Sequence, residues 1–194
     1  MKFKITFVIL ALVVFSQQII SQNYKIDSGH SLVQIQVERF GVIDVVGRFN
    51  DVSGTIMFDK NNVSKTTANA LIKVESYDAN NKAGEGAVKS KAFLDAKTYP
   101  EITFKSSKTI VKNGIGYLVG NLTIHGKTNQ IELPFSIKGP LLDLPTRKQS
   151  IAFEASITIN RQDYGVSFDR KLPNGTMIVG NDVKITLLVL AIAE

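Results

Sequence analysis

The sequence predicts an all-β protein, an eight-stranded antiparallel β-barrel with one short helix packed against it. Apolar residues alternate with polar ones over most of the chain, which is typical of strands that bury one face. Turns that contain Gly or Asn separate these runs at short intervals, as they do in antiparallel hairpins. A single segment has a helical period, which favours a barrel over a layered α/β fold.

The first half of the expected domain contains three strands. They cover residues 31–37, 45–58 and 69–75, and we expect Gly47 and Gly54 to bend the long middle strand. Each strand alternates in the way expected for a sheet with one face buried. The residues predicted to face inward are Val33, Ile35, Val37, Ile56, Phe58, Ala70, Ile72 and Val74.

The helix is predicted over residues 88–96, after the polar segment 76–86. Its apolar residues recur at offsets of four, five and eight, which places them on one side of a helix. Pro100 ends the helical pattern because it disfavours helical geometry at Tyr99. The helix should lie over the sheet with Phe93 buried. The residues that carry this period are Val88, Ala92, Phe93 and Ala96.

Five further strands follow, beginning after Pro100. Hairpin turns are expected at Asn113-Gly114 and His125-Gly126. Pro134 does not suit a paired strand, so we expect the strand over 131–137 to be unpaired or bulged there. At eight strands, a barrel interior is either filled by side chains or just wide enough for one small ligand. The inward residues of this half include Ile102, Phe104, Leu118, Leu122, Ile131, Phe135, Phe153, Ile157, Val183 and Ile185.

Three ordered motifs carry a resemblance to a known family. They read KSKAFLD at 89–95, YPEITFKS at 99–106 and GNLTIHG at 120–126. In these motifs the chain resembles the YceI-like family of lipid- and polyisoprenoid-binding proteins. Further segments similar to the family are YKIDSGHS at 24–31, GRF at 47–49 with GTI at 54–56, INRQDYG at 159–165 and VGNDV at 179–183.

The resemblance implies an exported, lipocalin-like barrel that holds a long isoprenoid or fatty chain in an elongated apolar cavity. It implies no catalytic residue. This chain departs from the family at two polar positions. Arg39 stands where relatives commonly have His, and Glu85-Gly86-Ala87 stands where they have an Asp-x-His pair. By this comparison, the candidate contacts for a ligand head group are Arg39 and Glu85.

The N-terminus has the pattern of a secretory signal peptide. Lys2 and Lys4 precede the apolar run 5–15, which is short for a membrane span, so we expect a signal peptide over 1–22 and one barrel domain over 23–194. An uncleaved signal anchor is the alternative. The expected location is periplasmic or secreted, without stable membrane insertion of the mature chain. Cleavage would lower the formal charge from +6 to +4.

Composition excludes several other functions. The lysines are scattered over outward positions and turns, so no basic face for nucleic acid is expected. There is no Cys, and the two histidines, His30 and His125, are 95 positions apart, which does not predict a metal site. Nucleophile-elbow, phosphate-loop and dinucleotide motifs are also missing from the sequence, so we expect neither catalytic residues nor a cofactor.

Three functional hypotheses remain, and the oligomeric state stays open, a homodimer included. The first is a binder of a long-chain apolar lipid, such as a polyisoprenoid, an isoprenoid quinone or a fatty acid. The second is a structural or interaction barrel filled by Phe side chains. The third, an enzyme, is disfavoured because few polar groups converge. The predicted cavity lining is Val33, Ile35, Phe58, Ile72, Phe104, Leu122, Phe135 and Phe153.

Overall fold

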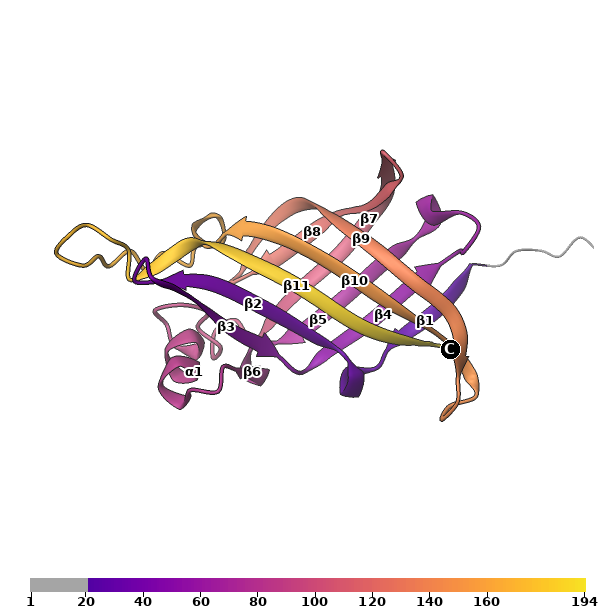
Figure 1. The fold of residues 1–194 in the computed structure, drawn as a ribbon, viewed down its shortest axis with the longest axis horizontal. Coiled ribbons are helices and arrows are strands. Elements are labelled where there is room, and N and C mark those ends of the chain that lie inside the picture. The colour runs from indigo at the N-terminus through magenta and orange to yellow at the C-terminus, as the bar shows by residue number, and fades with distance from the viewer. Residues whose placement is uncertain (1–20) are drawn as a thin grey trace, which may run out of the picture.

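The computed structural model describes residues 21–194. The expected signal peptide over 1–22 therefore lies outside the described residues, except for Ser21 and Gln22. Gln22 is the first residue of strand β1, one position before the start expected for the domain. From β1 to the C-terminal strand the chain forms one antiparallel sheet that curves into a barrel (Figure 1).

The elements between residues 21 and 194 are eleven strands, one α-helix and four short 3-10 helices. The strands are β1 Gln22–Ile26, β2 Leu32–Arg39, β3 Ile43–Phe49, β4 Val52–Phe58, β5 Thr67–Lys73, β6 Tyr77–Asp78, β7 Glu101–Lys112, β8 Ile115–Ile124, β9 Lys127–Asp143, β10 Lys148–Asn160 and β11 Val179–Ala193. The helices are α1 Lys82–Lys89, η1 Ser28–His30, η2 Val63–Lys65, η3 Val74–Ser76 and η4 Arg161–Tyr164.

These strands make an eight-stranded barrel because three of its strands are each interrupted once. β1 continues as β2, β3 as β4 and β5 as β6, and each pair keeps one direction in the sheet. β1 pairs with β4 on one side and with β11 on the other, which closes the ring. The prediction of a closed eight-stranded antiparallel barrel with one short helix is confirmed. The long strand expected over 45–58 is broken at Asn50 and Asp51.

Two hairpin turns form at their predicted positions. Asn113 and Gly114 have φ values of 51° and 79°, and His125 and Gly126 have values of 50° and 74°. Two successive positive φ values define the type I′ turn, whose twist matches that of the strands it joins. The Asn-Gly and His-Gly pairs therefore set the register of β7, β8 and β9.

Pro134 lies in β9, where the sequence predicted a local loss of pairing. On one side it stands opposite Tyr117 of β8. On the other side, the register between β9 and β10 ends at Phe135, opposite Ala155. β10 then runs on toward η4 without pairing to β9. The predicted loss of pairing is confirmed on this side, where a residue that lacks an N–H donor costs no ladder bond.

The helix prediction was wrong in its bounds. α1 covers Lys82–Lys89, whereas most of the predicted segment 88–96 consists of turns. The Asn81 side chain starts the helix because it accepts hydrogen bonds from the backbone N–H groups of Ala83 and Gly84. The apolar residues after Lys89 share one side because the turns direct them toward the barrel.

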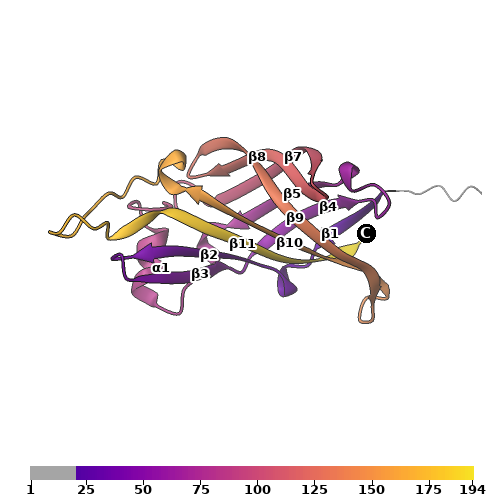
Figure 2. The same cartoon turned by 45° about the horizontal axis from the view of Figure 1, so that its top comes forward.

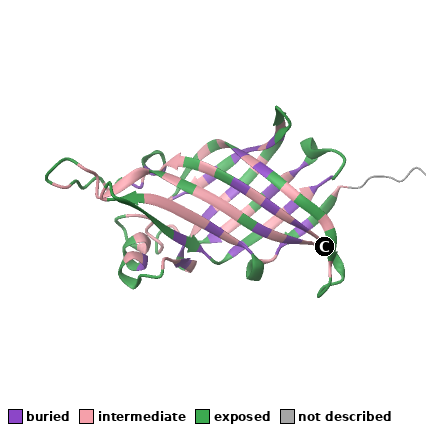
Figure 3. Ribbon diagram, in the orientation of Figure 1, coloured by how far each residue is buried: buried purple, intermediate pink, exposed green. Residues whose placement is uncertain are grey.

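The barrel interior is packed at one end and hollow at the other. At the end near the C-terminus, Ile151 is only 1% exposed and the rings of Phe135 and Phe153 stack at 5.5 Å. Fully buried positions alternate along these strands, whereas strands near α1 are more exposed (Figure 3). Two views place α1 and the loop between η4 and β11 at the same end, far from the C-terminus (Figures 1 and 2).

Candidate binding cavity

An apolar cavity of about 670 Å³ occupies the hollow part of the barrel. Ile56 and Leu118 lie at its inner limit, where they are 2% and 0% exposed. At the other limit the wall includes Val45, which is 37% exposed, and Arg39, which is also exposed. The cavity therefore opens to solvent at the end of the barrel that carries α1. We call this opening the mouth.

Successive inward positions of β2 and β11 form one long wall. Val33 stands opposite Leu187 and Ile35 opposite Ile185, and all four side chains belong to the lining. The inward positions of β2 continue to Arg39 at the mouth. From Val33 to Arg39 the wall extends about 20 Å, at about 3.3 Å per residue. The cavity is thus elongated along the strands.

Six of the eight predicted lining residues lie on the cavity wall: Val33, Ile35, Ile72, Phe104, Leu122 and Phe153. The structure places the other two, Phe58 and Phe135, outside the lining. Phe58 is 7% exposed at the far end of β4, opposite Gln22. Phe135 stacks behind Phe153 and packs against Gly116. A side chain at position 116 would place its Cβ 2.9 Å from the Phe135 ring, so the glycine leaves room for that ring.

Five phenylalanines are bulky enough to fill an eight-stranded barrel, and the structure divides them between its two ends. Phe58 and Phe135 belong to the packed end, whereas Phe49, Phe104 and Phe153 line the cavity without closing it. Phe49 instead packs against Tyr77, with ring centroids 5.2 Å apart. The interior is hollow over part of its length.

α1 and the turns after it cover a gap in the barrel wall. Within residues 21–194, β6 pairs only with β3, and β7 pairs only with β5 on this side. No strand of this range therefore bridges β6 and β7 near the mouth. Val88 and Phe93 fill part of the gap and face the cavity. The half-buried Phe93 stacks on Phe168 at 4.8 Å, which joins this segment to the loop before β11.

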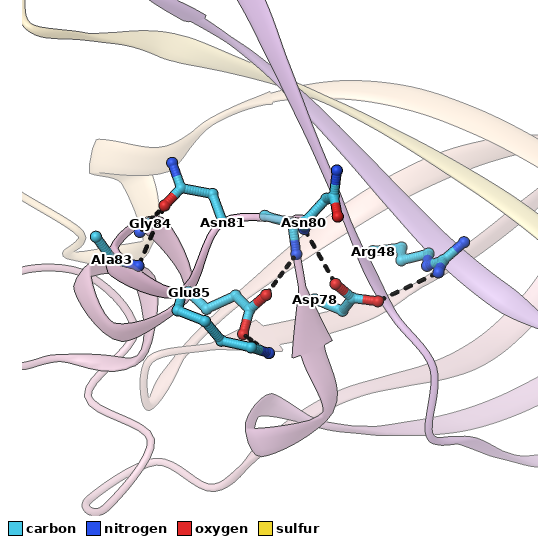
Figure 4. A network of polar contacts seen from close by, with 9 residues as sticks. Arg48, Asp78, Asn80, Asn81, Ala83, Gly84 and Glu85 are labelled. Carbon is cyan, nitrogen blue, oxygen red and sulfur yellow. Dashed lines mark hydrogen bonds and ion pairs between the residues drawn. The ribbon is translucent and has the colours of Figure 1, made fainter.

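Glu85, a predicted head-group contact, belongs to α1 but is not part of the cavity lining. Its carboxylate accepts hydrogen bonds from Lys82 Nζ at 2.8 Å and from the Ala79 backbone N–H at 3.4 Å (Figure 4). The hydrogen bond from Lys82 lowers the pKa of Glu85 despite the burial of the carboxylate. These contacts fix the first turn of α1 beneath the capping residue Asn81.

Arg39, the other predicted head-group contact, lies on the cavity wall at the mouth. The residue is exposed, and its guanidinium lies over the Phe40 ring at 4.1 Å. Stacking on a ring face leaves the N–H groups at the guanidinium edges accessible. Among the described residues, no carboxylate forms an ion pair with Arg39.

Arg161 is a wall residue that the sequence analysis did not single out. It is 5% exposed and donates hydrogen bonds to the carbonyl oxygens of Val166, Phe168, Val179 and Gly180. Burial lowers its pKa, an effect that Asp169 partly opposes. One signal was available: Arg161 continues the inward period of Ile157 and Ile159, as Arg39 continues that of Ile35 and Val37.

His125 lies in the predicted hairpin turn, and His30 is the last residue of the 3-10 helix η1. His30 Nδ1 is 2.7 Å from an Asp27 oxygen, and the His125 ring packs edge-on against Tyr99 at 4.4 Å. Within residues 21–194, no three side chains of His, Asp, Glu or Cys gather into a metal-binding group. In the same range, no helix has the length and apolar character needed to cross a membrane.

The fold and the cavity define a closed antiparallel β-barrel with a long, hollow, apolar interior. Comparison with known proteins places the chain more narrowly. It belongs to the YceI-like domain family, whose model matches residues 24–191. The UPF0312 proteins of Yersinia pestis and Yersinia enterocolitica are each 31% identical to it over 153 residues, covering 77% of this chain and 79% of the relative.

Solved structures share the fold. BcnA of Burkholderia cenocepacia superposes with a TM-score of 0.73 at 26% identity, covering 85% of this chain and 98% of BcnA. The Campylobacter jejuni YceI protein has a TM-score of 0.68 at 24% identity, covering 81% and 90%. A polyisoprenoid-binding domain of Saccharophagus degradans has a TM-score of 0.67 at 15% identity, covering 88% and 98%.

Proposed function

We propose that this protein is a non-catalytic lipid binder that encloses one long apolar chain in its barrel. The observation that carries the proposal is the elongated cavity of about 670 Å³, whose wall is formed mainly by aliphatic and aromatic side chains. Cavities that hold small ligands range from about 300 to 1,000 Å³ and are mostly apolar. The Saccharophagus degradans domain, described as polyisoprenoid-binding, supports the same class of ligand by its shared fold.

The shape of the cavity favours a chain over a compact ligand. Its wall follows β2 and β11 for about 20 Å and ends against packed side chains. An apolar chain that enters at the mouth would release water from this surface, which is the main favourable term in such binding. A polyisoprenoid, an isoprenoid quinone and a long fatty acid all have the required form.

We further propose that the protein is exported, either to the periplasm or out of the cell. Support comes from Lys2, Lys4 and the apolar run 5–15 of the sequence. N-terminal sequencing of protein recovered outside the cytoplasm should begin near Gln22 or Asn23. Exported material that still begins at Met1 would contradict cleavage.

Lipid occupancy provides the test of the binding function. Protein purified under mild conditions should carry a long-chain lipid that native mass spectrometry detects and organic extraction releases. Leu122→Asn puts an amide into the cavity wall, where it finds few partners, so it should remove most of the bound lipid. Leu142→Asn makes the same change at a side chain that is 57% exposed on the β9–β10 hairpin, and it should leave occupancy unchanged.

Two results would favour a structural barrel instead. The first is wild-type protein that leaves the cell empty and takes up neither a fatty acid nor a prenyl lipid at micromolar concentration. The second is an experimental structure in which the cavity has closed around the Phe side chains. Equal loss of lipid in Leu122→Asn and Leu142→Asn would instead indicate lipid held outside the barrel.

A further inference from the structure

The charges on the cavity wall are all of one sign. The lining drawn from residues 21–194 includes two arginines, Arg39 and Arg161, and no Asp, Glu, Lys or His. An apolar wall with low dielectric strengthens the field of any charge that it carries. The cavity that encloses an apolar chain is therefore electropositive at the positions of these two arginines.

Strand register places both arginines at the mouth. Arg39 is the last residue of β2 and stands opposite Val179 of β11. Arg161 Nη2 donates to the Val179 carbonyl oxygen at 3.2 Å, and Nε donates to that of Gly180 at 2.9 Å. Both arginines therefore lie beside the first residues of β11.

Nearby carboxylates do not cancel this charge on the wall. Glu38 and Asp44 are opposed across β2 and β3, on the outward face, and Asp44 accepts a hydrogen bond from Gln36 Nε2 at 2.7 Å. Asp169 is close enough to influence Arg161 but is exposed in the loop before β11. None of these three residues lines the cavity.

The two arginines differ in what they can offer a ligand. Four of the five N–H donors of Arg161 form hydrogen bonds to backbone carbonyl oxygens, so its role is to hold the loop before β11 and to contribute charge. Arg39 is exposed at the mouth and stacked on Phe40, with no ion pair among the described residues. Its planar fork suits a carboxylate or a phosphate, each of which accepts two parallel hydrogen bonds.

We propose that the enclosed lipid ends in an oxyanion, a carboxylate or a phosphate, and that this group sits at the mouth against Arg39. Arg161 adds positive charge behind it. This inference rests on the proposed lipid-binding function and makes it more specific. It orients the ligand, with the chain toward Leu118 and the head toward solvent, and it selects acidic lipids over neutral lipids of the same length.

Pairs of lipids with the same chain and different head groups separate the contribution of the head group to binding from that of the chain. Palmitate is compared with hexadecanol, and geranylgeranyl phosphate with geranylgeraniol, as competitors of the neutral dye Nile red on delipidated protein at neutral pH. Each acid should bind about tenfold more tightly than its alcohol, the effect of one hydrogen bond to a charged group. The preference should shrink at about 0.5 M salt, because Arg39 is exposed.

Variants assign the preference to Arg39. Arg39→Gln should reduce binding of the acids about tenfold and leave the alcohols unchanged, whereas Arg39→Lys should keep part of the preference. Arg147→Gln removes the same charge from the hairpin at the opposite end of the barrel and should change neither. A preference for only one of the two acids would still support the inference and would identify the natural head as carboxylate or phosphate.

Two results would overturn the inference. If the alcohols bind as tightly as the acids, or if Arg39→Gln weakens acids and alcohols alike, the head group is not read as an anion, although lipid binding itself stands. If none of the four lipids displaces the dye, the proposed function fails and this inference fails with it.

Discussion

A pair of identical substitutions in β10 tests whether the barrel is packed at one end and hollow at the other. Ile151 and Ile157 face inward from the same strand, opposite Ala191 and Ile185 of β11. Ile151 is 1% exposed in the packed end, whereas Ile157 is half-buried on the cavity wall. Replacing each by Ala removes the same atoms from two different surroundings.

The expected costs differ because only one site leaves a new void. Ile151→Ala loses about 2.4 kcal/mol of transfer free energy, at about 0.8 kcal/mol for each carbon removed. If about 60 Å³ remains unfilled, the void adds about 1.4 kcal/mol, for a total near 4 kcal/mol. Ile157→Ala removes a half-buried side chain beside space that is already open. Its cost should be about 1 kcal/mol, roughly half the transfer term alone.

Urea unfolding of delipidated protein measures both costs. Each variant should lower the midpoint without changing the slope, which reports the surface exposed on unfolding. A lipid added at saturating concentration should widen the difference in unfolding free energy between wild type and Ile157→Ala, because the lipid chain would pack against Ile157. Equal losses in the two lipid-free variants would refute the reasoning, since they would mean that the cavity is closed in solution.

Three further predictions concern the segment around α1 and the titrating groups. Asn81→Ala should cost about 0.5 to 2 kcal/mol through loss of the cap, and Asn81→Ser should recover most of it, as measured by thermal unfolding. Phe93→Ala should cost about 1 to 2 kcal/mol, below the range for a fully buried Phe, because the ring is half-buried at the cavity and stacked on Phe168; a loss above about 3 kcal/mol would contradict that placement. Hydrogen bonds lower the pKa of Asp78, Glu85 and Asp143, so the stability that they contribute is present above about pH 4 and is lost as the pH falls through the lower folded-state values. The urea concentration at the unfolding midpoint should therefore decrease when the pH is lowered below about 4. A midpoint that rises on acidification would show that these carboxylates do not stabilise the fold.

Local patterns were sufficient for the strands and hairpins. Alternation at a period of two follows from strand geometry alone, so it identified the inward positions of β2, β5, β7, β8 and β10 before any contact was known. Turn chemistry acts over two residues, and the Asn113-Gly114 and His125-Gly126 turns formed where the sequence indicated.

The helix shows where a local pattern misleads. Val88, Ala92 and Phe93 line the cavity. Their spacing resembles one face of a helix, although turns after Lys89 bring them together. The signal that mattered was Asn81, whose side chain starts α1 inside the polar segment 76–86. A cap acts on the first turn of a helix, so a search for apolar periodicity alone overlooks it.

The sequence by itself determined an inward face, but not which part of that face encloses space. Phe104 and Phe135 both occupy inward positions of their strands. Phe104 lines the cavity, whereas Phe135 packs behind Phe153. The difference depends on strand stagger and on Gly116, which makes room for the Phe135 ring across β8 and β9. Such relations join residues far apart in the chain, and alternation carries no information about them.

The mouth was likewise decided by tertiary structure. Arg39 and Arg161 are separated by most of the chain and become neighbours only because β11 pairs with β2 and begins beside η4. The alternation of β2 and β10 is compatible with an inward position for each, but only Arg39 was proposed from the sequence, through the family resemblance. They carry the charge of the wall because the lining contains no carboxylate among the described residues. Glu85 of α1 and Asp169 of the loop before β11 both lie outside it.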